Sequence, residues 1–107
     1  MKPYLTVVNT TDKNKCNCVL WARERVPKLP YGLFMLWQKK RIINSQNPKA
    51  GSVAIINVGL WGHVAVVTKV GKNHITIREA NYRSCKITER HDTPKNLKIV
   101  GYFNPNK

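Results

Sequence analysis

The chain has 107 residues, with 19 Lys and Arg against five Asp and Glu, so its formal net charge is +14 at pH 7. This length leads us to expect one domain over residues 1–107, without a separate targeting or binding module. No apolar run reaches the roughly 18 residues of a membrane helix, and residues 1–11 lack the charged-then-apolar pattern of a secretion signal. We therefore expect a chain made in the cytoplasm, with no signal peptide and no transmembrane segment.

The first half of the chain favours helices, and prolines and glycines separate it from a strand-rich second half. Asn17 follows a polar, turn-like stretch and is a suitable N-cap for a helix over residues 18–26, which Pro27 ends. A second helix is predicted over residues 33–42, where a basic end suits a helix C-terminus. Cys18 is therefore expected at the first position of a helix.

Four segments of the second half are dense in β-branched and aromatic residues, a composition typical of strands. They cover residues 52–57, 63–70, 74–81 and 98–103. Short connections between them favour one mostly antiparallel sheet. N-terminal helices followed by such a sheet predict an α+β fold in which the helices pack on the sheet.

The turn around Lys72 sets the register between the second and third of these strands. It places His63 approximately opposite Asn81. Because side chains alternate along a strand, Glu79 and Asn81 share a face with core-facing isoleucines and are expected inward beside His63. Buried polar side chains need partners, and the imidazole is one. The alternative is an ordinary strand end that frays into solvent.

Three cysteines, an odd count, argue against a disulfide framework and for at least one free thiol. The spacing of Cys16 and Cys18 is too tight for a zinc knuckle, and no second Cys/His pair completes one, so no metal site is expected. An isolated cysteine is commonly a small buried hydrophobe. Position alone therefore leaves each thiol open to a packing role.

Cys18 gains a chemical role if the helix that it opens packs against the end of the sheet that carries His63. The free N–H groups and the dipole at a helix N-terminus stabilise a thiolate, and a neighbouring histidine lowers the pKa of the thiol further. Glu79 or Asn81 would then hold the imidazole in position. Cysteine, histidine and a polar orienting residue in this chain order indicate acyl transfer.

Six segments in order carry a family resemblance. They are residues 17–23 (NCVLWAR), 29–32 (LPYG), 48–54 (PKAGSVA), 62–67 (GHVAVV), 75–82 (ITIREANY) and 99–103 (IVGYF). Together they resemble the CHAP domain, the cysteine, histidine-dependent amidohydrolase/peptidase group within the NlpC/P60-like, papain-related superfamily. The resemblance covers most of the chain and implies a papain-like, NlpC/P60-like fold.

The resemblance also implies hydrolysis of an amide bond in bacterial peptidoglycan, by an endopeptidase or an N-acetylmuramoyl-L-alanine amidase. By position, Cys18 is the nucleophile, His63 the general base and then acid, and Glu79 the first choice of orienting residue. Asn81 is the orienting residue or an oxyanion support, and Trp61 is a substrate-binding residue of the cleft. Small chains of this kind occur as phage lysins, virion-associated wall enzymes and bacterial effectors or toxins, and we expect a phage origin first.

The remaining candidates are assigned no part in catalysis. Some relatives bind calcium through an Asp-rich loop before the cysteine, but here that loop holds Asp12 alone, so neither a metal nor another cofactor is expected. Cys16 and Cys85 are expected to be structural or incidental. His74 and His91 are expected on the exposed surface, His91 within a polar loop.

The charge of +14 predicts attraction to teichoic acids, lipopolysaccharide and other anionic envelope polymers, and activity that falls as salt rises. Residues 39–41 form the one tight basic cluster, and no basic run alternates with aromatic residues, so no specific nucleic acid is expected as a partner. We expect a monomer that acts on the bacterial cell wall. The alternative is a catalytically idle domain, or a basic polyanion-binding or nucleic-acid-binding domain in which Cys18 is a packed thiol.

Overall fold

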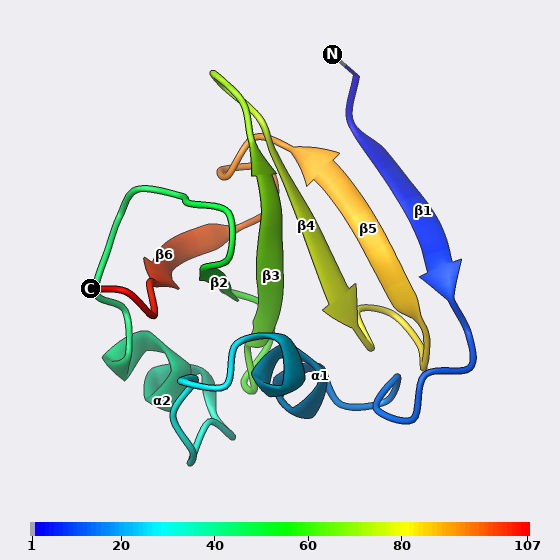
Figure 1. Ribbon diagram of the computed structural model, residues 1–107, viewed down its shortest axis with the longest axis horizontal. Helices are drawn as coiled ribbons and strands as arrows, with labels where there is room; N and C mark the ends of the chain where they lie inside the picture. Colours follow the sequence, from blue (N-terminus) through cyan, green and yellow to red (C-terminus); the bar gives the residue numbers. More distant parts are fainter. Residues whose placement is uncertain (1) are drawn as a thin grey trace.

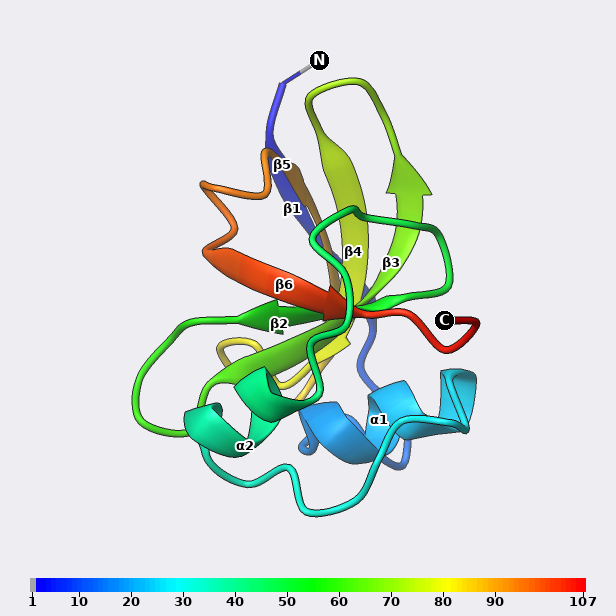
Figure 2. The same cartoon turned by 90° about the vertical axis from the view of Figure 1, so that its left-hand side faces the viewer.

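Residues 2–107 are described by the computed structural model, and their strands form one antiparallel sheet (Figure 1). The strands are β1 (Tyr4–Asn9), β2 (Val53–Ile56), β3 (His63–Val70), β4 (Ile75–Ala80), β5 (Ile87–Asp92) and β6 (Ile99–Phe103). Their order in the sheet is β1-β5-β4-β3-β2-β6. The sheet twists strongly, so that β2 and β6 run across the direction of β4 and β5 in Figure 2.

Two short helices lie at one end of this sheet (Figures 1 and 2). α1 (Cys18–Arg25) begins where the side chain of Asn17 accepts hydrogen bonds from two N–H groups of the first turn, at 3.1 and 3.0 Å, and it ends before Pro27. α2 (Leu36–Arg41) is shorter than the predicted second helix. No helix among residues 2–107 is long and apolar enough to cross a membrane.

The expectation of an α+β, papain-like fold with N-terminal helices packed on the sheet is wrong. The chain opens with the strand β1 rather than with a helix, and α1 and α2 contain only eight and six residues. Isolated helices below about 12–15 residues are marginal in water, so both of these depend on the sheet that they contact. The observed architecture is a small β-rich fold in which two short helices cover one end of a six-stranded sheet.

β1 and β5 are the two strands that the sequence patterns did not predict. β1 is exposed along all six residues, so it lacks the buried face that makes a strand pattern easy to find. β5 is rich in polar residues and was expected to belong largely to a loop. His91, which was expected to be exposed in that loop, lies in β5 and is only 7% exposed, so this expectation is also wrong. The polar side chains of β5 are explained by their partners on the neighbouring strands.

Two apolar clusters cover the opposite faces of the sheet. One joins α1 and the segment after it to the sheet and contains Trp21, Ala22, Val26, Leu29, Leu33, Val53, Ile55, Val64, Val66, Ala80 and Ile87. The other contains Ala54, Ile56, Ala65, Val67, Ile75, Ile77, Leu97 and Tyr102. On β4, the second cluster continues along one face from Ile75 and Ile77 to Glu79, which is fully buried. The buried face of β4 therefore ends with a carboxylate, as the alternation of side chains along the strand predicts.

Candidate active site

Cys18 is the first residue of α1, where the N-cap pattern predicts it. Its side chain is half-buried, and it is the one free thiol among the three cysteines, all of which lie within residues 2–107. The Asn17 side chain occupies the N–H groups of the next two residues, whereas the Cys18 N–H has no acceptor within the described part of the chain. The start of α1 therefore presents a thiol next to a free backbone donor.

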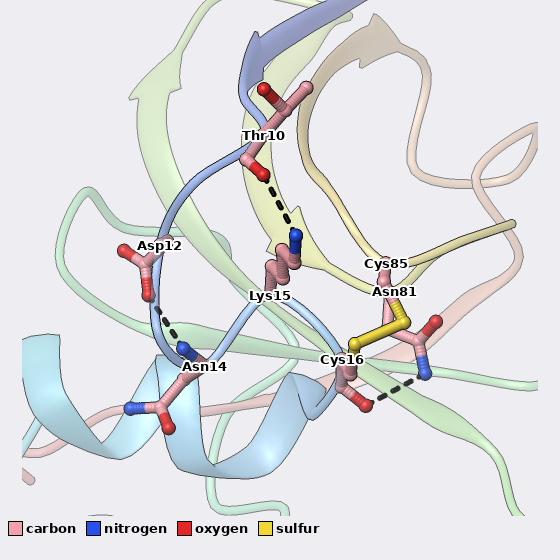
Figure 3. The surroundings of a disulfide bond; sticks show 7 residues. All are labelled: Thr10, Asp12, Asn14, Lys15, Cys16, Asn81 and Cys85. Atoms are coloured by element: carbon pink, nitrogen blue, oxygen red, sulfur yellow. Dashed lines mark hydrogen bonds between the residues drawn. A yellow bond between two sulfur atoms is a disulfide. The ribbon is translucent and has the colours of Figure 1, made fainter.

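Cys16 and Cys85 form a disulfide, which corrects the expectation drawn from the odd cysteine count (Figure 3). The bond joins the loop before α1 to the turn after β4, and these two segments adjoin Cys18 and Glu79. A second link runs in parallel, because Asn81 Nδ2 donates to the backbone carbonyl of Cys16 at 3.0 Å. Of the two roles expected for Cys16 and Cys85, the structural one therefore applies.

His63 begins β3 and is 4% exposed. The preceding residue, Gly62, has a φ of 70°, and a Cβ at this position would lie 2.7 Å from Leu36 Cδ1. Glycine therefore lets α2 pack closely against the loop that leads to His63. The imidazole Nε2 lies 3.2 Å from Glu79 Oε1, and the Cys18 thiol interacts with the same ring and raises its pKa. Cys18, His63 and Glu79 thus form one line of interacting groups, in which His63 is common to both interactions.

Glu79 is held by β5 as well as by His63. Arg90 donates from Nη2 to Glu79 Oε1 at 2.7 Å, and from Nε to both carboxylate oxygens at 3.1 Å. Thr88 Oγ1 donates to Oε2 at 3.3 Å. The guanidinium carbon of Arg90 lies 3.6 Å from the centre of the Tyr82 ring, a cation–π contact that fixes the arginine in turn. Arg90 therefore supplies the cation that a buried carboxylate needs in order to stay ionised.

The pKa shifts of the three groups in this line favour a charged arrangement. Burial raises the pKa of the Cys18 thiol, but its hydrogen bond to His63 and the charge of that ring outweigh burial, and the pKa lies below its ordinary value. Burial lowers the pKa of His63, but its interactions with Cys18 and Glu79 raise the pKa above its usual range. Burial raises the pKa of Glu79, yet hydrogen bonds from His63 and Arg90 hold it below its usual range. The pKa shifts of Cys18 and His63 both favour a thiolate–imidazolium pair beside a carboxylate.

The Cys18 thiol lies in a cleft of about 530 Å³. The walls of this cleft come from α1, from the segment between the two helices and from the loop before β3. Three aromatic side chains of the walls, Tyr31, Phe34 and Trp61, are 84, 74 and 62% exposed. Among the described residues that line the cleft, none is acidic. Cys18, His63 and Glu79 therefore lie beside an open cleft with aromatic and positively charged walls. Such a cleft is suitable for binding a substrate.

The structure brings together three of the five predicted site residues, Cys18, His63 and Glu79. Trp61 lies in the wall of the same cleft, where a substrate would contact it. Asn81 lines the cleft too, but its positive φ of 58° turns it out of β4, and its exposed side chain donates to a backbone carbonyl of the loop before α1. The expectation that Asn81 points inward beside His63 is therefore wrong. Its expected part in catalysis stays a prediction.

Two residues of the cleft and its support were not predicted from the sequence. Arg90 lies in β5, which was expected to be part of a loop. The sequence feature that could have indicated Arg90 is the expected burial of Glu79, because a buried carboxylate needs a cation as its partner. Lys39 was expected only as part of a basic cluster at the C-terminal end of a helix. It is only 3% exposed and lines the cleft, whereas the adjacent Lys40 is exposed. Nothing in the local sequence distinguishes these two lysines.

The loop before α1 contains a single acidic side chain that could bind calcium. Its carboxylate, Asp12, accepts a hydrogen bond from the Asn14 N–H at 2.9 Å and lies 3.5 Å from Arg25 Nη2. Within residues 2–107, no group of three or more His, Cys, Asp or Glu is arranged to hold a metal ion. The acidic side chain of this loop is therefore engaged by groups of the protein itself.

Comparison with the sequence patterns of known families matches residues 8–81 to the CHAP domain, which is more than half of the chain. No curated protein and no solved structure gives a significant match. The matched region contains Cys18, His63 and Glu79 and ends at Asn81. The strand β5, with Arg90, lies beyond it.

Proposed function

The chain belongs to the CHAP domain family of cysteine- and histidine-dependent amidohydrolases and peptidases, and we propose that it hydrolyses an amide bond of bacterial peptidoglycan. The observation that carries the proposal is the line of interacting groups formed by Cys18, His63 and Glu79 beside an open cleft. CHAP domains often occur in peptidoglycan hydrolases, which favours the cell wall as the source of the substrate.

The first half of the proposed reaction forms a thioester on Cys18. The thiolate attacks the carbonyl carbon of the scissile amide, and the electron pair of the carbonyl moves onto its oxygen. The free N–H of Cys18 and the second N–H of the Asn81 amide are the proposed donors to this oxyanion. The imidazolium of His63 gives its proton to the leaving amine as the carbon–nitrogen bond breaks. A thioester, a free amine and a neutral imidazole remain.

The second half of the reaction hydrolyses the thioester. Neutral His63 takes a proton from a water molecule, whose oxygen attacks the thioester carbonyl. The Cys18 sulfur leaves as a thiolate, so the thiolate–imidazolium pair is restored and a carboxylic acid is released. Glu79 stabilises the imidazolium and orients the ring, and Arg90 keeps Glu79 ionised and in place.

The substrate-binding part of the proposal rests on the cleft walls and on the charge of the chain. Exposed aromatic side chains such as Trp61 suit the apolar faces of sugars and of short peptide side chains, so we propose that Trp61 contacts the substrate. The charge of +14 supports attraction to anionic envelope polymers near the target bond. Activity should then fall as ionic strength rises, because salt screens exposed charges. Equal activity at low and high salt would rule out this contribution.

We further propose that the protein acts as a monomer on the bacterial cell wall, as a phage lysin or as a wall-degrading effector. The Cys16–Cys85 disulfide supports a place of action outside the reducing cytoplasm, because disulfides persist in oxidising compartments. A phage lysin and a wall-degrading effector would carry out the same reaction, the hydrolysis of an amide bond in an intact or fragmented cell wall.

The function is tested with purified peptidoglycan incubated with wild-type protein and with Cys18→Ala. Wild-type protein is expected to release soluble fragments, whereas Cys18→Ala should release none above the background. Mass spectrometry of the fragments then identifies the bond from the new carboxyl end: a new carboxyl on an amino acid indicates an endopeptidase, and a free lactyl carboxyl on muramic acid indicates an amidase. Release by both proteins at the same rate would contradict the proposal. Retention on DNA without any release of wall fragments would favour a basic polyanion-binding domain instead.

A further inference from the structure

Lys39 is a buried lysine that the proposed reaction steps leave without a part. It lies in α2, and its side chain is 3% exposed. Its ammonium group donates three hydrogen bonds of 2.8 Å, to the backbone carbonyls of Leu33, Phe34 and Trp61. An ammonium group has three N–H donors, so this set occupies all of them. A lysine is rarely buried without a carboxylate partner, which makes this arrangement informative.

The three carbonyls belong to two segments that both line the cleft. Leu33 and Phe34 lie between the helices, and Trp61 lies in the loop that leads to His63. The same two regions are joined once more by the Leu36 N–H, which donates to the Leu60 carbonyl at 3.1 Å. The ammonium of Lys39 therefore joins two wall segments that carry exposed aromatic side chains of the cleft.

Lys39 also places a positive charge in the cleft that holds Cys18. The other charged or titratable side chains in the described lining, apart from Cys18 itself, are Arg23, Tyr31 and His63. Arg23 is directed elsewhere, because its Nε and Nη2 donate to the carbonyls of Leu29 and Pro30 at 3.1 and 2.6 Å. The charge of Lys39 contributes to the lowered pKa of Cys18, after the effects of burial, of His63 and of the Val64 backbone. In return, the Cys18 charge raises the pKa of Lys39, which burial lowers.

We propose that Lys39 is a positioning residue of the active site, which joins the two cleft walls and supplies a buried positive charge that favours the thiolate of Cys18. The inference rests on the proposed function for its biological meaning, but its physical content is the reactivity of one thiol. A lysine that served only to cap backbone carbonyls would stabilise the fold without changing the titration of Cys18.

The test compares Lys39→Met with the matched control Lys40→Met. Both changes remove one positive charge from α2, but Lys40 is exposed while Lys39 is buried. The probe is iodoacetamide, applied to the disulfide-intact protein over a range of pH, so that Cys18 is the thiol that reacts. Lys39→Met should react about three- to tenfold more slowly than wild type on the acid side of the profile, because loss of a nearby positive charge raises the pKa of a thiol. Lys40→Met should match wild type.

Circular dichroism and thermal unfolding establish which variants are folded at the temperature of the assay. A folded Lys39→Met protein whose alkylation profile superposes on that of wild type would overturn the inference. If Lys39→Met does not fold, the reciprocal measurement decides, because Cys18→Ala keeps Lys39 in place. In Cys18→Ala, NMR of the Lys39 Cε and Nζ should show a lower pKa for Lys39 than in wild type, and an unchanged pKa would overturn the inference.

This experiment separates the inference from the proposed hydrolysis. A shifted alkylation profile in a protein that cleaves no peptidoglycan would support Lys39 as a positioning residue and contradict the proposed substrate. Cleavage of peptidoglycan by wild-type protein, together with the same alkylation profile for Lys39→Met and wild type, would support the proposed substrate and contradict Lys39 as a positioning residue. Where both hold, Lys39→Met should lower kcat more than it raises KM, because fewer Cys18 side chains are reactive at a given pH.

Discussion

The protein contains two buried histidines in strands, and the surroundings of their rings differ. His63 is 4% exposed and His91 is 7% exposed. Each ring bonds a side chain on a neighbouring strand through one nitrogen: His63 Nε2 lies 3.2 Å from Glu79 Oε1, and His91 Nδ1 lies 2.8 Å from Thr76 Oγ1. Burial and one hydrogen bond are therefore common to both.

The other groups around each ring distinguish the two histidines. His63 meets the thiol of Cys18 in an open cleft, and its carboxylate partner is itself held by an arginine. His91 is stacked between Tyr4 and His74, with ring centres 5.3 and 5.4 Å apart, and its Nε2 has no partner among residues 2–107. A buried imidazole becomes a candidate for proton transfer when a carboxylate and a nucleophile sit on its two sides. In an aromatic stack it contributes packing instead.

The largest predicted effect comes from removing His63. His63→Ala should lower kcat by about 10⁴-fold, because both the proton donor to the leaving amine and the base for thioester hydrolysis are lost. The rate of peptidoglycan fragment release measures this, with circular dichroism to show that the variant is folded. A variant that kept a tenth or more of wild-type activity would remove His63 from the reaction.

The next largest effect comes from Glu79→Gln, which keeps the shape of the side chain and removes its charge. We expect kcat to fall by about 10²-fold, because the imidazolium loses the partner that stabilises it. Glu79 raises the pKa of His63, so its loss should also move the alkaline limb of the pH–rate profile to lower pH. An unchanged alkaline limb in the pH–rate profile would mean that Glu79 does not act through His63.

The pH profile of the wild-type enzyme follows from the same two groups. The active pair forms as pH rises through the lowered pKa of Cys18 and is lost as pH rises through the raised pKa of His63. The acid limb should therefore lie below the ordinary thiol value of about 8.5, and the alkaline limb above the ordinary imidazole value of about 6.5. Initial rates measured across this range test the order of the two limbs. A profile that rises only near pH 8.5 would indicate an unperturbed thiol.

Loss of the Cys16–Cys85 disulfide should have an intermediate effect. The double variant Cys16→Ser/Cys85→Ser is expected to lose about 2–5 kcal/mol of unfolding free energy. Activity should fall less steeply, by about two- to tenfold at a temperature where the protein stays folded, because the Asn81 hydrogen bond still links the same two segments. Urea unfolding and fragment release, measured on one preparation, separate the two effects. Equal unfolding midpoints for the variant and wild type would show that the disulfide does not stabilise the fold.

The smallest effect is expected at the other histidine. His91→Phe keeps a flat ring in the stack with Tyr4 and His74, and removes both Nε2, which has no partner in the described structure, and the Nδ1 that bonds Thr76 Oγ1. Activity should stay within about twofold of wild type, while stability should fall by about 1–3 kcal/mol because the buried Thr76 hydroxyl loses its partner. A loss of activity comparable with that of His63→Ala, in a folded variant, would end the distinction between the two histidines.

Local patterns predicted the parts of the site that depend on neighbours in the sequence. Asn17 caps α1 and so places Cys18 at its start. The predicted hairpin of β3 and β4 forms, with Val66 opposite Arg78, although its pairing contains a bulge between Val67 and Lys69 and stops before His63 and Asn81. Alternation along β4 correctly put Glu79 inside. Each of these follows from hydrogen bonding or side-chain direction within one turn or one hairpin.

The remaining parts depend on contacts between distant segments. Cys16 and Cys85 are 69 positions apart, and β1 pairs with β5, so neither was visible in a local window. Arg90 was assigned to a loop because its partner, a buried carboxylate, lies on another strand. Lys39 looked like its exposed neighbour because the carbonyls that it binds come from other segments. Long-range pairing also favoured a β-rich fold over the expected α+β arrangement.

The central claim is that Cys18 carries the acyl group of the cleaved amide, and trapping that thioester tests it most directly. Wild-type protein and Cys18→Ala are mixed with peptidoglycan fragments, quenched in acid and examined by intact-mass and peptide-level mass spectrometry. We predict an added mass equal to the acyl part of the substrate, located on Cys18 and absent from Cys18→Ala. Cleavage by Cys18→Ala at the wild-type rate, or an acyl group found on another residue, would contradict the account.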